Sequence, residues 1–162
     1  MKTRPLVLLA GLALPLSTQS ASAQAEPAKN DSAFRALQDR GAKHMGVDQY
    51  TSVHHFASLP DGGRIELQRA VEDTAGVREI RHHLQQIAEA FRRGDFKIPG
   101  LVHDTAEVPG TRKMAEHKAH ISYEFHELPR GGEVRIISSD HEAIAAIHEF
   151  LEFQRHEHHA TE

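Results

Sequence analysis

The sequence predicts an α+β fold in which two ββα units pair into one four-stranded antiparallel sheet with two helices on one face. The first observation behind this prediction is an internal repeat, because Leu-Pro-x-Gly-Gly-x-apolar-x-apolar occurs at residues 59–67 and again at 128–136. The second is the alternation of apolar residues around the repeat, with the period of two that half-buried strands have. The third is a run of apolar residues at helical spacing after each copy. The expected architecture is a two-layer sandwich, ferredoxin-like or similar, preceded by a short N-terminal helix.

Residues 1–23 have the pattern of a secretory signal peptide. Lys2 and Arg4 precede an apolar run, and Ala21-Ser22-Ala23 is a small-residue cleavage site. The apolar run has about twelve residues, whereas a membrane-spanning helix needs roughly 20. We therefore expect cleavage near Ala23, a periplasmic or secreted protein, and a mature chain without a membrane span.

Residues 24–45 are predicted to form a polar lead-in and a short helix. An Asp-Ser pair at 31–32 can cap this helix, and Phe34 and Leu37 supply an apolar stripe. The rest of the chain, 46–162, has the length of a single domain and contains both copies of the repeat. We therefore predict one ββα-ββα domain over these residues.

Each copy of the repeat has the features of a ββα unit. Its Pro-x-Gly-Gly segment supplies a fixed φ followed by residues that tolerate positive φ, as a tight hairpin requires. An aspartate then stands at the position of a helix N-cap, Asp73 in the first copy and Asp140 in the second. Apolar residues follow at matching offsets, namely Val77, Ile80 and Leu84 in the first copy and Ile144, Ile147 and Leu151 in the second.

Composition narrows the classes of function and partner. Signal cleavage would leave 17 basic and 23 acidic residues, and an acidic chain without a basic stripe is not expected to bind nucleic acid. The sequence has no cysteine, so neither disulfides nor thiolate metal sites are available. Helices on one face leave the other face of the sheet open, and a homodimer through that open face is the protein interaction that this fold permits.

All 14 histidines follow the predicted cleavage site. For those in the predicted helices, the position around the helix indicates whether the side chain is buried or exposed. At about 100° per residue, His83 lies beside the apolar stripe of the first repeat's helix, whereas His82 points to the opposite side. In the second repeat's helix His148 falls between Ile144 and Leu151, on the face predicted to be buried. A buried imidazole needs a partner, because an unpaired buried polar group costs about 1–3 kcal/mol.

A metal site is the function that these histidines favour. His54 shares a strand face with Phe56 and is expected to point inward, and His103 is followed by Asp104, whose carboxylate could orient the ring. Converging between sheet, helices and connection, the four histidines would offer nitrogen ligands suited to copper or zinc. The predicted metal ligands are therefore His54, His83, His103 and His148.

Two further features could contribute to metal binding. The tail His156-Glu157-His158-His159 carries three imidazoles that could bind copper, nickel or zinc loosely, although a soluble helix end is the simpler interpretation. Met45 and Met114 carry the soft thioether that Cu(I) prefers, although buried methionine in a core is the commoner role.

The leading prediction is an exported histidine-rich binding protein that holds a transition metal or a metal-bearing ligand. Residues 96–111 contain two Pro-Gly pairs and are predicted to form a long connection, so a small-molecule enzyme or binder could use the cleft beneath them, with His103 as acid or base. A structural or interaction domain without a ligand is a third alternative. The chain has no Gly-x-Ser-x-Gly, P-loop or Gly-x-Gly-x-x-Gly motif, which argues against the enzymes that use them.

Several segments resemble a family of small exported bacterial proteins whose function is uncharacterised. They are RGAKHMGVDQY at 40–50, IRHHL at 80–84, GDF at 94–96, VHD at 102–104, VPGT at 108–111 and AIHEFL at 146–151. The resemblance covers nearly the whole mature chain and implies export, but neither an activity nor a ligand. Some similar chains bear the label aspartate carbamoyltransferase. Such enzymes are much longer, with two α/β domains and a Ser-Thr-Arg-Thr phosphate loop, and this sequence has no counterpart of either.

Overall fold

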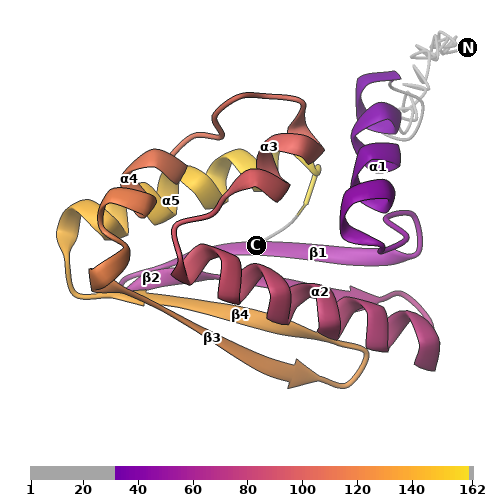
Figure 1. Ribbon diagram of the computed structural model, residues 1–162. Helices are drawn as coiled ribbons and strands as arrows, with labels where there is room; N and C mark the ends of the chain where they lie inside the picture. Colours follow the sequence, from indigo (N-terminus) through magenta and orange to yellow (C-terminus); the bar gives the residue numbers. More distant parts are fainter. Residues whose placement is uncertain (1–31, 161–162) are drawn as a thin grey trace, which may run out of the picture.

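The computed structural model describes residues 32–160 (Figure 1). The predicted signal peptide and the lead-in up to residue 31 lie outside these described residues. Within 32–160, none of the helices combines the length and the apolar character that crossing a membrane requires.

The elements follow the predicted order of two ββα units. In the first half of the chain they are α1 (Ser32–Met45), β1 (Ser52–Leu59), β2 (Gly62–Arg69) and α2 (Thr74–Arg92). The second half contains α3 (Lys97–His103), α4 (Thr111–Glu116), the 3₁₀ helix η2 (Lys118–His120), β3 (Ile121–Leu128), β4 (Gly131–Ser138) and α5 (His141–Glu157). The predicted α+β class, with a four-stranded antiparallel sheet, is confirmed.

The two repeats are related by a pseudo-twofold axis through the centre of the sheet. The strand order is β1-β2-β4-β3, and all neighbours are antiparallel. At the centre Ile65 is opposite Val134, its equivalent in the second repeat. The pairing on either side keeps the same offset, since Gly62 is opposite Ile137 and Gly131 is opposite Gln68. The repeated sequence therefore forms a repeated structure.

The two long helices begin at the predicted N-caps. The carboxylate of Asp73 accepts a hydrogen bond from the Gly76 amide at 3.1 Å. The carboxylate of Asp140 accepts two, from the amides of Glu142 at 2.8 Å and Ala143 at 3.0 Å. An N-cap of this kind stabilises a protein by about 1 kcal/mol relative to alanine.

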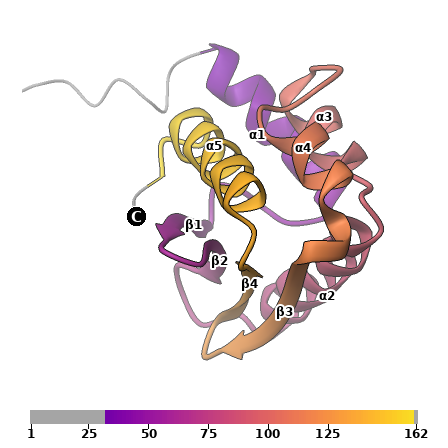
Figure 2. The same cartoon turned by 90° about the vertical axis from the view of Figure 1, so that its left-hand side faces the viewer.

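The hydrophobic core lies between the sheet and these two helices (Figure 2). Helix α2 packs on β2, β3 and β4, and α5 packs on β1, β2 and β4. The two helices meet where Phe91 and Phe150 contact edge to face, with ring centres 5.8 Å apart. Both aromatic rings are fully buried, so this contact holds the helices at one end of the core.

Residues 96–111 differ from the long connection predicted from sequence, because they contain α3 and the first residue of α4. Pro99 stands in the first turn of α3, where a residue needs no amide hydrogen for the helical hydrogen bonds. The pair Pro99-Gly100 is therefore compatible with a short helix. Helix α1 packs against α3, and Arg40 Nε donates a hydrogen bond to the carbonyl of Val102 at 2.7 Å.

The face of the sheet opposite α2 and α5 carries charged side chains at its centre. Arg64 lies 3.8 Å from Glu66 on the same strand and 4.0 Å from Glu133 on β4. Nearby, Arg135 forms an ion pair with Asp61 at 2.6 Å. A homodimer through this face stays a prediction, and it would have to accommodate these charges.

Candidate functional site

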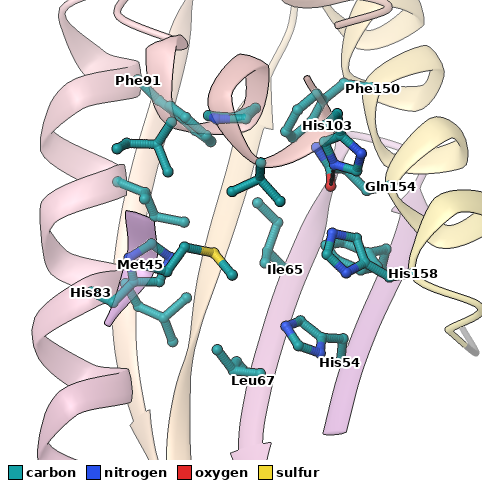
Figure 3. Close-up of a pocket in the computed structure, with 16 residues that line it drawn as sticks. Met45, His54, Ile65, Leu67, His83, Phe91, His103, Phe150, Gln154 and His158 are labelled. Atoms are coloured by element: carbon teal, nitrogen blue, oxygen red, sulfur yellow. Dashed lines mark hydrogen bonds between the residues drawn. The ribbon is translucent and has the colours of Figure 1, made fainter. Parts of the chain in front are cut away.

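A cavity of about 60 Å³ lies in the core between α2 and α5, bounded by β1 and β2 and by α3 (Figure 3). Its polar lining residues are four histidines and one glutamine: His54, His83, His103, His158 and Gln154. The remaining lining residues are apolar: Met45, Phe56, Ile65, Leu67, Leu84, Ile87, Phe91, Ile98, Pro99, Val102 and Phe150. Among the described residues that line the cavity there is no aspartate, glutamate, lysine or arginine.

His54 points into the cavity from β1, as the sequence predicted. Its ring stacks beside that of Phe56, with ring centres 6.0 Å apart. Burial of the ring, together with nearby His83 and His55, lowers the pKa of His54 to about 4. The ring of His54 is therefore a neutral imidazole at physiological pH.

His83 faces the same cavity from α2, which confirms the prediction from helical phase. It is 6% exposed, whereas its neighbour His82 is exposed on the opposite side of the helix. Burial, with a smaller effect of His82, lowers the pKa of His83 to about 4. His83 is thus a second neutral imidazole in the cavity wall.

His103 is the last residue of α3 and reaches the cavity from above the sheet. Its Nε2 lies 2.9 Å from Oε1 of Gln154 on α5. A carbonyl oxygen only accepts, so Nε2 carries the hydrogen and Nδ1 carries the lone pair. This Nδ1 is buried and has no hydrogen-bond partner. Burial lowers the pKa of His103, and the bond to Gln154 partly opposes that effect.

Gln154 therefore orients the His103 ring. The sequence suggested Asp104 for this role, and that prediction is wrong. Asp104 caps the C-terminal end of α3 in the left-handed conformation, with φ of 52°. Its side chain is exposed and lines a groove on the outer side of α3. Adjacent residues diverge at this helix end, which separates the carboxylate from the imidazole.

His158 lines the cavity and is absent from the set of metal ligands predicted from the sequence. Its amide caps the end of α5 by donating to the carbonyl of Gln154, and its ring turns back into the cavity. The ring stacks on His54 with centres 5.1 Å apart and stands edge-on to His103, also at 5.1 Å. Burial, then the nearby rings of His54 and His103, holds the pKa of His158 well below its usual range.

The structure does not bring His148 together with the other predicted ligands. His148 is half-buried on the flank of α5, and its Nε2 donates a hydrogen bond to the carbonyl of Leu59 at 2.9 Å. Helical phase measured from Ile144 places His148 on the buried face, but Ile144 is itself only half-buried. The fully buried face is centred near Ile147, and His148 lies about 100° from it.

The fold separates the other residues that the sequence suggested as metal ligands. In the tail, His156 is exposed, and His159 stacks on Phe34 of α1 with ring centres 4.6 Å apart. Met45, at the end of α1, lines the cavity, whereas Met114 is fully buried elsewhere in the core. Only one of the two methionines is thus placed beside the histidines.

The four histidine rings are neutral polar groups in an otherwise apolar cavity, and two of them are partly unsatisfied. In addition to Nδ1 of His103, Nδ1 of His158 is buried without a hydrogen-bond partner. Unsatisfied buried polar groups of this kind cost about 1–3 kcal/mol each and are uncommon unless a ligand or water completes them. As their side chains are placed, no three histidines, aspartates or glutamates within 32–160 form a group that could hold a metal ion.

Comparisons with known proteins identify no relative of this chain. No protein-family model matches the chain, and neither a curated protein nor a solved structure matches it.

Proposed function

We propose that this protein is an exported, periplasmic or secreted, binding protein that holds one copper or zinc ion on His54, His103 and His158. The observation that carries the proposal is the buried lone pair on Nδ1 of His103. The hydrogen bond from Nε2 to Gln154 fixes which nitrogen is available, and histidines that bind metals commonly have their other nitrogen held in this way. The unpartnered Nδ1 of His158 supports a second ligand.

The spacing of the rings supports a shared ion. Two imidazoles that bind one zinc ion at about 2.0–2.1 Å in tetrahedral geometry have ring centres about 5 Å apart. The pairs His54–His158 and His103–His158 both have ring centres 5.1 Å apart. The stacked rings of His54 and His158 must rotate about their side-chain torsions to aim their nitrogens at one point. Binding therefore requires changes of these side-chain torsions.

The protonation state of the rings also favours a metal. A histidine binds a metal as neutral imidazole, so protons compete with the ion. The lowered pKa values of His54, His103 and His158 remove this competition at neutral pH. The site would therefore bind an ion without having to release protons first.

The size of the cavity limits the ligand. A volume of about 60 Å³ holds an ion with a water or a very small molecule, whereas pockets for organic ligands are usually about 300–1,000 Å³. The larger groove outside α3 is lined by Asp104 and not by His103, which points into the core. This arrangement favours a metal ion over the alternative of a small-molecule enzyme with His103 as acid or base.

The test uses two neighbouring histidines of β1. Untagged protein should contain about one copper or zinc ion per chain after dialysis against a weak chelator, measured by mass spectrometry. His54→Phe should lose the ion, whereas His55→Phe, on the opposite face of the strand, should retain it. Added metal should raise the melting temperature of the parent protein and of His55→Phe only, because a ligand that binds the native state stabilises it. Metal-free parent protein whose melting temperature is unchanged by copper and zinc would refute the proposal.

A further inference from the structure

The cavity is lined by one sulfur-containing side chain in addition to its histidines. Met45 is the last residue of α1, and Figure 3 shows its side chain reaching into the cavity, with the sulfur between the His83 side and the His158 side. A thioether is a soft ligand that binds Cu(I) well and binds Zn(II) poorly. The same wall thus carries imidazole nitrogen and thioether sulfur.

The local backbone fixes where Met45 points. Gly46, with φ of 70°, ends α1 in the left-handed conformation, and its amide donates to the carbonyl of Ala42 at 3.0 Å. The next residue, Val47, is fully buried and anchors the turn in the core. Gly41 leaves room for the end of the side chain, because a Cβ built there would lie 3.1 Å from Cε of Met45. The thioether is therefore held at the cavity by the fold of this segment.

The charge of the cavity also bears on which ion it would take. The described lining residues include no carboxylate, and the donor atoms that they offer are imidazole nitrogens and one thioether sulfur, so none of the ligands would carry a negative charge. A buried charge without a counter-charge is costly, and the cost rises steeply with the charge of the ion. A monovalent ion therefore suits this cavity better than a divalent one.

From the neutral lining and the placement of the thioether we infer that the ion is Cu(I), bound by the histidine cluster with Met45 as its sulfur ligand. This inference rests on the proposed metal site and specifies its ion and its oxidation state. It adds a ligand from α1, so the helix that precedes the ββα-ββα domain completes the site. Met114, which is buried away from the cavity, supplies the matched control.

The experiment compares Cu(I) and Zn(II) affinities in four proteins without a tag. Each is titrated anaerobically with Cu(I) against a coloured competing chelator, and separately with Zn(II). The proteins are the parent, Met45→Leu, Met114→Leu and His158→Phe. Exchange of methionine for leucine conserves volume and usually costs less than about 1.5 kcal/mol, so both variants should fold, which circular dichroism checks.

The inference predicts that Met45→Leu weakens Cu(I) binding at least tenfold and changes Zn(II) affinity less than twofold, while Met114→Leu changes neither. X-ray absorption of the Cu(I) form should show a sulfur neighbour in the parent and in Met114→Leu, but not in Met45→Leu. Equal Cu(I) affinity in the parent and Met45→Leu, or a parent spectrum without sulfur, would overturn the inference while leaving a histidine metal site intact. If the parent binds neither ion, the proposed function itself fails. Loss of both ions in Met45→Leu would assign Met45 a structural role and also overturn the inference.

Discussion

Nε2 of His103 donates a hydrogen bond to Oε1 of Gln154 at 2.9 Å, and this bond leaves Nδ1 of His103, a residue that lines the cavity, as a buried lone pair without a partner. The two residues belong to different helices, α3 and α5. Gln154 therefore acts as a positioning residue that fixes both the tautomer and the direction of the imidazole.

The first prediction concerns this bond. Gln154→Leu removes the acceptor and should weaken metal binding by about 10- to 100-fold. This is the usual effect of losing a residue that hydrogen-bonds to a metal-binding histidine. Gln85→Leu, an exposed position on α2, is the matched control and should leave the affinity unchanged. The measurement is a competition titration with the metal that the parent protein binds. Equal affinities in the two variants would show that Gln154 does not position the ligand.

The second prediction separates the two histidines of α5 and its end. His158→Phe should abolish metal binding, because His158 contacts both His54 and His103. His148→Phe should keep the metal but lower stability by about 1 kcal/mol, since it loses the hydrogen bond to Leu59. Metal content and chemical denaturation of the two variants check this. Retention of the ion by His158→Phe would contradict the assignment of His158.

The third prediction concerns pH. An imidazole in the unfolded chain has a pKa near 6.5, whereas folded His54 and His83 accept protons only near pH 4. Between these values the unfolded state binds more protons, so the free energy of unfolding should fall as the pH drops from about 6.5 to about 4. At about 1.4 kcal/mol per pKa unit, each of the two residues contributes up to about 3 kcal/mol to this fall.

The matched pair for the pH prediction is His83→Leu and His82→Leu. Denaturation of metal-free protein at several pH values should show a reduced slope in His83→Leu and the parental slope in His82→Leu, which alters an exposed residue. Carboxylates with lowered pKa values, such as Asp73 and Asp140, begin to lose their contribution only below about pH 5, so the slopes are compared between about pH 6.5 and pH 5. Identical slopes in all three proteins would contradict the buried neutral state of His83.

The fourth prediction tests the repeated fold. Asp73→Ala and Asp140→Ala should each lower the free energy of unfolding by about 1 kcal/mol, because each removes an N-cap. Glu89→Ala, at an exposed position inside α2, should change it by less than about 0.5 kcal/mol. Urea denaturation provides the values. If only one of the two variants had a lower free energy of unfolding, the two ββα units would not depend equally on their N-caps.

Much of the fold could be predicted from the sequence because the repeat constrains it twice. The turn residues, the strand alternation and the N-cap aspartates occur in both copies, and each copy supports the interpretation of the other. The pairing of Ile65 with Val134 follows from that symmetry. Helix α3 was not predicted, because Pro99-Gly100 reads locally as a turn and tertiary packing under α1 stabilises the helix instead.

The candidate site was predicted less completely, for a reason that lies in α5. Helical phase measured from Ile144 turns the expected buried face toward His148. Centred on Ile147, the face continues through Leu151 and Gln154, at the offsets i+4 and i+7. The next position in that series, i+11, is His158. If the apolar stripe of α5 is continued by one turn, it predicts that His158 lies on the buried face. The contacts of its ring with His103 of α3 and His54 of β1 depend on tertiary structure and cannot be predicted in this way.

The proposed metal site is tested most directly by a nuclear magnetic resonance spectrum of the imidazole nitrogens, recorded with and without one equivalent of Cu(I) or Zn(II). If the ion binds to His54, His103 and His158, the resonance of Nδ1 of His103 should shift as that of a metal-bound nitrogen while its Nε2 keeps its hydrogen. The ring resonances of His54 and His158 should also shift. The ring of His148 should stay unchanged. Shifts confined to the exposed His156 and His159, or an unchanged His103, would contradict the proposed metal site.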